Sequence, residues 1–315
     1  MEISNQEAVR CGENAFYQLD GSGFLKISGS GKVEMRLEHE LGDAVREVVI
    51  GEGITEIGDR TFMFCPNLKT VSFPSTLEKI GQFAFMECEK LESIDLPDSV
   101  CEIGNEAFKG CNSIECVRIP RGITVPNVDS FRNCKKLKRV IIHENCFMPC
   151  KNTFLGCDKL TEFVFTEESD FVQRDGVVYS KDMTKLTLYP VALKPKEFTV
   201  PESVTRIDNR AFEFCENLES LNLPEKLEAI GFLAFSCCTN LRTVRIPEGV
   251  SELPALTFLS CRKLESVYLP KSVKRLDKAA FIGCRSLERV YYAGTEEEWK
   301  NVVGREEVEV EVMFE

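Results

Sequence analysis

Cysteine and histidine are the residues of this chain best suited to chemistry. The sequence contains 15 cysteines and two histidines, His39 and His143. A nucleophilic cysteine would need one of these histidines beside its thiol. The set closest to a zinc site is His143, Cys146, Cys150 and Cys157, whose spacing matches no usual paired arrangement. Acidic residues fall at solvent positions, and the glycines at 21–31 fit hairpin turns rather than a phosphate loop. We therefore expect no catalytic residue, no metal site and no cofactor.

Most of the cysteines instead mark a repeat of 23 residues. Those in register are Cys65, Cys88, Cys111, Cys134, Cys157, Cys215, Cys238, Cys261 and Cys284. Each has a phenylalanine three residues before it and Leu or Ile three residues after it. A fixed period of about 20–50 residues is typical of a solenoid. We interpret these cysteines as small apolar packing residues with free thiols, because neighbouring strands are about 4.8 Å apart and disulfide Cβ atoms about 3.8 Å.

Each repeat predicts a short strand, a turn and a short helical turn. The segment LESIDLP at 91–97 has apolar residues at Ile94 and Leu96 and ends in proline, as short strands do. A Gly, Asn or Asp usually precedes the Ala-Phe pair, at Gly58, Gly81, Gly104, Asn127, Asp208, Gly231 and Asp277. These residues suit a left-handed turn or a helix N-cap. We favour the cap, because Pro254 occupies this position once and cannot adopt positive φ.

Charge and hydropathy exclude two kinds of partner. The net charge of −12 argues against nucleic acid, which usually requires a clustered basic face. No apolar run approaches the roughly 18 residues that a membrane span needs, so we expect no membrane insertion.

The N-terminal MEISNQEAVR lacks the basic start and apolar stretch of a signal peptide. The odd number of cysteines does not suggest a complete disulfide framework. A chain with this many unpaired thiols is expected to fold best in a reducing or anaerobic setting.

The repeat resembles that of the BspA-like leucine-rich repeat family. The pattern Leu-x-x-Ile-x-Leu-Pro-x-Ser-Val-x-x-Ile-Gly-x-x-Ala-Phe-x-x-Cys is clearest at 91–111 and 218–238. Segments 17–31 and 290–302 resemble the hairpin before such arrays and the segment that closes them, and 175–190 resembles an irregular insert. The resemblance implies a leucine-rich-repeat solenoid, an α+β right-handed superhelix. Parallel short strands line its concave face, with short helical turns and loops elsewhere. It also implies a non-enzymatic binding protein, typically bacterial and surface-located or secreted, with some adhesins among its relatives.

The spacing of the repeats predicts five segments along the chain. They are an N-terminal cap with a Gly-rich hairpin at 1–45, a first array of five coils at 46–162, an irregular hairpin insert at 163–197, a second array of four coils at 198–289 and a C-terminal cap at 290–315. Asp175-Gly176 between apolar runs predicts a hairpin that projects from the stack. Pro126 and Pro149 interrupt the fourth and fifth coils. Trp299 and the alternating VEVEVMF predict a cap that adds edge strands.

A ligand-binding surface is expected on the concave strand face. The residues that should point outward there are Ser72, Asp95, Arg118, Ile141, Val164, Thr199, Asn222, Arg245, Tyr268 and Tyr291. We take the last four, Asn222, Arg245, Tyr268 and Tyr291, as the candidate binding strip. Arg and Tyr dominate recognition hot spots, and stacked tyrosines suit sugar rings. The alternative is that Tyr and Arg simply pair well across parallel strands.

Two functions are compatible with these features. The first is a bacterial surface or secreted recognition or adhesion module for a protein or glycan of a host or neighbouring cell. The second is an intracellular scaffold for protein–protein interaction. We expect a monomer, located at the cell surface or secreted if residues are missing before Met1, and cytoplasmic if Met1 is the native start.

Overall fold

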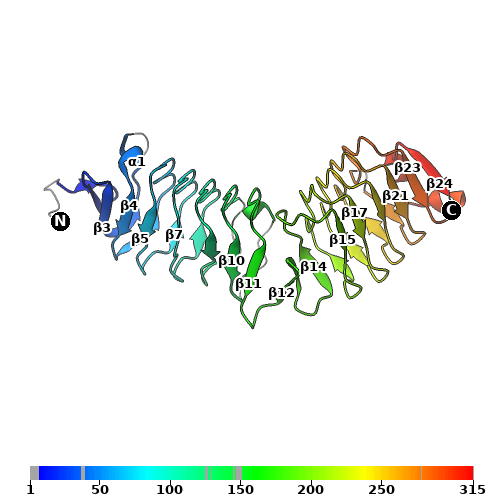
Figure 1. Ribbon diagram of the computed structural model, residues 1–315, viewed down its shortest axis with the longest axis horizontal. Coiled ribbons are helices and arrows are strands. Elements are labelled where there is room, and N and C mark those ends of the chain that lie inside the picture. Colours follow the sequence, from blue (N-terminus) through cyan, green and yellow to red (C-terminus); the bar gives the residue numbers. More distant parts are fainter. Residues whose placement is uncertain are drawn as a thin grey trace. The chain divides into compact units, whose positions relative to one another are not determined.

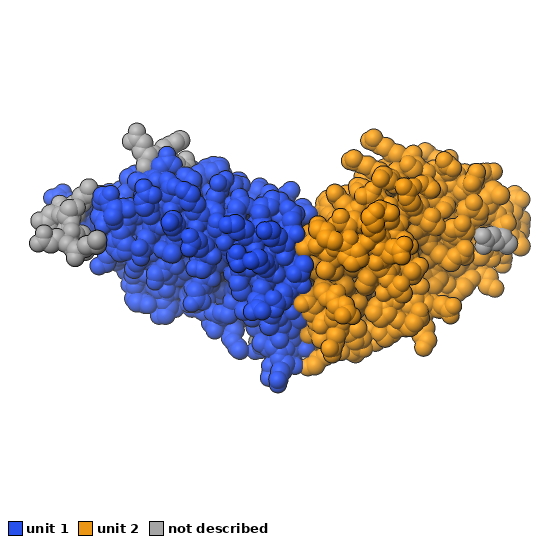
Figure 2. Space-filling model, viewed as in Figure 1, with its two compact units in different colours: residues 1–169 blue, residues 170–315 orange. Residues whose placement is uncertain are grey.

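The chain forms two compact units, Met1–Ser169 and Asp170–Glu315 (Figure 2). Each unit is a stack of short coils (Figure 1). The computed structural model describes residues 7–36, 40–124, 127, 129–144, 146, 151–277 and 279–314. Four residues used in the sequence predictions, His39, Pro126, Pro149 and Cys150, lie outside the described residues. None of the described helices is long and apolar enough to cross a membrane.

Two ladders of parallel strands build the first unit. The ladder of the strand face contains β4 (Glu47–Ile50), β6 (Thr70–Ser72), β9 (Cys116–Arg118), β10 (Arg139–Ile142) and β11 (Glu162–Phe165). The second ladder contains β5 (Ile54–Ile57), β7 (Lys79–Ile80) and β8 (Glu102–Ile103). Equivalent residues are 23 apart, as Val48 and Val71 are. In the third coil the strand predicted at 91–97 is reduced to a bridge between Ile94 and Val117.

An antiparallel hairpin begins the first unit. It consists of β2 (Asn14–Leu19) and β3 (Phe24–Val33), with β1 (Val9–Arg10) at its edge. Strand β3 also pairs in parallel with β4 and β5, so the hairpin covers the first coil of both ladders. The remaining elements are the short helix α1 (Glu40–Ala44) and the 3-10 helix η1 (Lys151–Phe154).

The second unit repeats this plan. Its strand face contains β15 (Glu197–Thr199), β17 (Ser220–Asn222), β19 (Thr243–Arg245), β21 (Ser266–Leu269), β23 (Arg289–Tyr292) and β24 (Glu311–Phe314). The other strands are β12 (Phe171–Arg174), β13 (Val177–Ser180), β14 (Lys185–Leu188), β16 (Arg206–Ile207), β18 (Ala229–Ile230), β20 (Glu252–Leu253) and β22 (Arg275–Leu276). Helix α2 (Glu296–Trp299) and the 3-10 helix η2 (Arg305–Glu307) precede β24, which extends the ladder as the alternating C-terminal residues predict.

The hairpin predicted at Asp175-Gly176 is present, but it does not project alone. Both residues have positive φ, 49° and 83°, as a tight two-residue turn requires. Strand β13 pairs with β14, and β14 pairs in parallel with β16, so the hairpin continues into the second ladder. Tyr189 lies 23 residues before Phe212 and stacks on it, with ring centroids 5.1 Å apart. The segment therefore provides the first coil of the second unit.

The short helical turn predicted in each repeat is present in the fifth coil, as the 3-10 helix η1, whereas most of the described coils have tight turns at this position. The segment after Gly58 is a series of tight turns, in which Arg60 and Phe64 both have φ of 59°. The N–H group of Arg60 donates to the carbonyl of Gln82 in the next coil, at 2.9 Å, and Phe64 donates in the same way. Hydrogen bonds between coils thus satisfy backbone N–H and carbonyl groups that a helix would pair within itself. Glycine is favoured before this turn by close packing, because a Cβ atom at Gly81 would lie 2.6 Å from the amide nitrogen of Asp59.

The interior of each unit is a column of stacked aromatic rings beside a column of thiols. Centroids of neighbouring rings lie 5.0 Å apart for Phe62 and Phe85, and 5.2 Å apart for Phe85 and Phe108. The thiol of Cys111 donates to the carbonyl of Phe85 at 3.2 Å. All nine repeat cysteines are free thiols, and all except the half-buried Cys284 are buried. The prediction that these cysteines serve packing is confirmed.

Candidate binding surface on the strand face of the second unit

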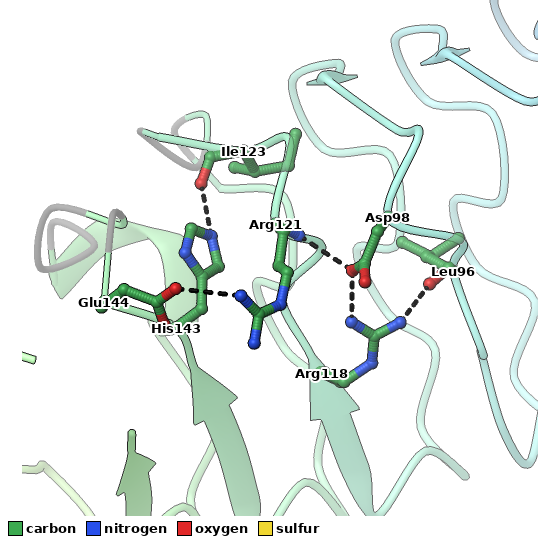
Figure 3. Close-up of polar contacts among 7 residues, drawn as sticks. All are labelled: Leu96, Asp98, Arg118, Arg121, Ile123, His143 and Glu144. Carbon is green, nitrogen blue, oxygen red and sulfur yellow. Dashed lines mark hydrogen bonds and ion pairs between the residues drawn. The ribbon is translucent and has the colours of Figure 1, made fainter. Parts of the chain in front are cut away.

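Of the four residues closest to a zinc-binding pattern, the three that the structure describes, His143, Cys146 and Cys157, are buried in the first unit. The Nε2 atom of His143 lies 3.0 Å from the carbonyl oxygen of Ile123, and the imidazole is buried (Figure 3). Cys157 donates its thiol proton to the carbonyl of Phe131 at 3.1 Å. Burial raises the pKa of Cys146 to about 11, which disfavours the thiolate that binds metals and attacks substrates. Among the described residues, no group of three His, Cys, Asp or Glu side chains could hold a metal ion.

The four residues of the predicted binding strip occupy one row of outward positions. Arg245 pairs with Tyr268, and Tyr268 pairs with Tyr291, across the parallel strands β19, β21 and β23. Asn222 occupies the equivalent position of β17, where its Nδ2 donates to Thr199 Oγ1 at 3.1 Å. Asn222 and Arg245 are exposed, whereas the two tyrosines are half-buried. The structure therefore places the predicted residues on one accessible surface.

Side chains of the strip stack on one another. The guanidinium of Arg245 lies 4.3 Å from the ring centroid of Tyr268. The rings of Tyr268 and Tyr291 are stacked, with centroids 4.5 Å apart and planes inclined by 7°. Such contacts contribute about 0.5–1 kcal/mol for an exposed cation–π pair and about 0.5–1.5 kcal/mol for an aromatic pair. The stacking holds these side chains in place, which reduces the entropy lost when a ligand binds.

Stacking also determines what the tyrosines can offer to a ligand. Strand β21 lies between β19 and β23, so Arg245 covers one face of the Tyr268 ring and Tyr291 covers the other. The hydroxyl group and ring edge of Tyr268 are left to meet a partner. The hydroxyl of Tyr291 contacts Arg289, which raises the pKa of that guanidinium. A sugar ring stacked flat on Tyr268 is therefore excluded by this arrangement.

A groove of about 580 Å³ runs beside the strip. Three strip residues, Asn222, Arg245 and Tyr268, line it. Its lining also includes apolar residues at and near the prolines that end the strands, together with Glu225 and Glu248. The sequence prediction did not include these two glutamates, although their spacing of 23 residues was a signal that could have revealed them. The groove gives the strip the concavity that binding sites usually have.

The equivalent outward positions of the first unit carry other types of side chain than the strip of the second unit. Ser72 and Asp95 are exposed and small, and Ile141 is a half-buried apolar residue. Arg118 is held in place by Asp98 Oδ1 at 2.6 Å and by the carbonyl of Leu96 at 2.8 Å (Figure 3). The first unit therefore has no stacked row of Arg and Tyr comparable to that of the second unit, within the described part of its strand face.

The fold and the repeat define a leucine-rich-repeat solenoid, with parallel strands and little helix. The chain belongs to the BspA-type leucine-rich repeat family. The BspA type leucine-rich repeat region matches residues 55–183 and 191–303, which is more than half of the chain. The fold and family predicted from the sequence are thus confirmed. A search of curated proteins found no match.

Solved structures of bacterial leucine-rich repeat proteins are similar along most of the chain. A leucine-rich cell surface protein of Faecalibacterium prausnitzii is 25% identical with a TM-score of 0.56, and the match covers 96% of this chain and 98% of that one. A leucine-rich repeat protein of Eubacterium ventriosum is 22% identical with a TM-score of 0.67, covering 90% and 84%. The pneumococcal vaccine antigen PcpA is 19% identical with a TM-score of 0.64, covering 98% of each chain. The last two similarities show the fold alone.

Proposed function

We propose that this chain is a non-enzymatic binding protein that recognises a protein ligand through the strand face of its second unit. The observation that carries the proposal is the continuous stack of Arg245, Tyr268 and Tyr291 beside the groove. Arg and Tyr are enriched among residues that dominate binding energy, particularly when they are held rigidly. Membership of a repeat family whose relatives present extended surfaces is consistent with this role.

A protein ligand fits this surface better than a glycan. Recognition of sugars by tyrosine commonly uses the ring face, and both faces of Tyr268 are covered. Hydroxyl groups, a guanidinium and the Asn222 side chain can instead exchange hydrogen bonds with the backbone and side chains of a protein. Binding of a glycan through hydroxyl contacts alone is the competing outcome of the experiment below.

Location at the cell surface or secretion is part of the proposal. It is supported by the similarity to the leucine-rich cell surface protein of F. prausnitzii. The alternative is an intracellular scaffold, and it is favoured by the free thiols of the described cysteines, since such thiols persist best in reducing surroundings. Locating the protein by fractionation of its native cells distinguishes the two.

The test compares purified variants on protein and glycan arrays. We expect the wild-type chain to bind a subset of proteins, and the variant Arg245→Ala/Tyr268→Ala/Tyr291→Ala to lose those signals. A control variant, Ser72→Ala/Asp95→Ala, changes the equivalent outward positions of the first unit and should retain the binding signals. Equal signals from the wild type and the triple variant would contradict the proposal. Loss confined to glycan signals would replace the protein ligand by a glycan.

A further inference from the structure

A row of carboxylates borders the groove of the second unit. Glu202, Glu225 and Glu248 each follow the proline that ends a strand, at intervals of 23 residues. All three are exposed, and Glu225 and Glu248 line the groove. Within the described residues, none of the three side chains has a hydrogen-bond or ion-pair partner. Lys271 continues the row, but it forms no ion pair with Glu248.

The same positions in the first unit are paired with one another. Ser75 donates its backbone N–H and its hydroxyl to Glu52, each at 3.0 Å. Arg121 donates its N–H to Asp98 at 3.1 Å and its guanidinium to Glu144 at 2.9 Å (Figure 3). Side chains 23 residues apart at these positions are therefore close enough for direct contact. In the second unit, that spacing brings like charges together.

Neighbouring carboxylates repel one another, and no ion pair with a described residue neutralises these three, although Arg245 lines the same groove and Lys271 follows Glu248 in the row. Like charges directly opposite on adjacent strands are destabilising, and the first unit avoids this by alternating charge or by a hydroxyl partner. The groove beside the row also has apolar walls, formed in part by Leu223, Ile246 and Pro247. A ligand that brings positive charge and some apolar surface would relieve the repulsion and fill the groove.

We propose that this groove binds an extended protein segment that carries Lys or Arg side chains. The inference rests on the proposed function, since it names the class of protein that the second unit would bind. Basic side chains of the segment pair with Glu225 and Glu248, and Glu202 prolongs the attraction along the stack. The segment's main chain lies against Leu223 and Pro247. Neighbouring strands of a sheet are about 4.8 Å apart, and alternate residues of an extended chain about 6.6 Å, so flexible basic side chains can reach successive glutamates of the row.

The test uses a ten-residue peptide of alternating lysine and alanine, with blocked ends, titrated calorimetrically into the full chain. A glutamate–alanine peptide of equal length is the probe of opposite charge. We expect the lysine peptide to bind and the glutamate peptide not to bind. Added salt should weaken binding of the lysine peptide. The variant Glu202→Gln/Glu225→Gln/Glu248→Gln should bind the lysine peptide about tenfold or more weakly.

A matched control separates the groove from the overall negative charge. The variant Glu216→Gln/Glu228→Gln/Glu252→Gln changes three exposed glutamates of the second unit outside the groove and gives the same net charge. Its affinity should remain within about twofold of the wild type, because exposed charges at a distance are screened. Equal weakening of both variants, or no binding by the wild type, would overturn the inference.

Failure of this inference is distinguishable from failure of the proposed function. If the glutamine variant binds every array protein as the wild type does, and the Arg245/Tyr268/Tyr291 variant binds none, the strip binds proteins but the groove does not select basic segments. If the lysine peptide depends on the three glutamates while the strip variant keeps all array signals, the inference holds without the strip. Circular dichroism of each variant confirms that it is folded.

Discussion

The thiol of Cys88 donates a hydrogen bond to the carbonyl oxygen of Phe62, 3.0 Å away in the preceding coil. The Phe62 N–H, in turn, donates to the carbonyl of Ala84 in the following coil at 2.7 Å. Phe62 therefore both accepts a hydrogen bond from the following coil, through its carbonyl, and donates one to that coil, through its N–H. Similar thiol contacts recur along both units, for example from Cys238 to Phe212 at 3.1 Å. The cysteine is thus a packing residue that also satisfies a buried carbonyl group, which alanine cannot do.

Replacing a phenylalanine in the middle of a stack should destabilise the first unit strongly. Phe108 is fully buried between Phe85 and Phe131, with centroids 5.2 and 5.4 Å away. We expect Phe108→Ala to lower the free energy of unfolding by about 3–5 kcal/mol, through lost burial and the cavity left behind. Chemical denaturation followed by circular dichroism measures the change. Phe64→Ala is the control, because that side chain is 50% exposed, and its effect should be much smaller.

Buried thiols should make folding stability fall at alkaline pH. Burial raises the pKa of Cys11 to about 11 from 9.0, and it raises the pKa of Cys111 well above its usual range. A raised pKa in the folded state means that the stabilisation is complete below the unfolded pKa and is lost as pH rises toward the folded value. Denaturation at about pH 8 and about pH 10 should therefore show weaker folding at the higher pH.

Substitution separates the buried thiol from other groups that titrate in that range. Cys111→Ala should lessen the loss of stability between the two pH values. Cys101→Ser/Cys116→Ser changes two exposed thiols and should leave the loss unchanged. An identical pH dependence in the wild type and in Cys111→Ala would contradict the assignment.

The repeat was predictable because its residues serve one local purpose in every coil. The inward Phe and Cys recur every 23 residues and are buried, so their types and spacing carried the fold. The turn segment was not predictable in the same way. Its hydrogen bonds run to the next coil, as from Phe62 to Ala84, and a pattern within one repeat resembles a helix start.

The candidate strip was only partly predictable. Alternation along β21 and β23 was enough to place Tyr268 and Tyr291 outward, because successive residues of a strand point to opposite sides. The distance between their rings and the resulting loss of free ring faces depend on rotamers, which sequence does not specify. Likewise, pairing across coils decides whether a carboxylate such as Glu248 is neutralised.

A hydrogen-bonded aspartate, Asp182, in the turn between β13 and β14 predicts a further pH effect. In the second unit, Asp182 Oδ1 accepts bonds from Ser180 Oγ and from the N–H and hydroxyl of Thr184. These bonds lower the pKa of Asp182 to about 2. A lowered pKa means that the stabilisation is present above the unfolded pKa of 3.8 and is lost as pH falls toward the folded value.

Asp182→Asn should accordingly lower the melting temperature at neutral pH and make it less sensitive to acid. Thermal melts at about pH 7 and about pH 3 measure both effects. Asp170→Asn, in the same hairpin region, provides a control, because its side chain has no such bonds among the described residues. Equal acid sensitivity of the wild type and Asp182→Asn would show that the three bonds do not act through the carboxylate.

Coupling between Arg245 and Tyr268 can be measured without a ligand. A double-mutant cycle of Arg245→Ala, Tyr268→Phe, Tyr268→Ala and the paired variants isolates the contact that joins them. We expect a coupling of about 0.5–1 kcal/mol with Tyr268→Ala, as for an exposed cation–π pair. Tyr268→Phe should retain most of it, since the ring and not the hydroxyl faces the guanidinium. A coupling of zero would show that the stack is not preformed in solution, and the strip would then lose the rigidity on which its role in recognition depends.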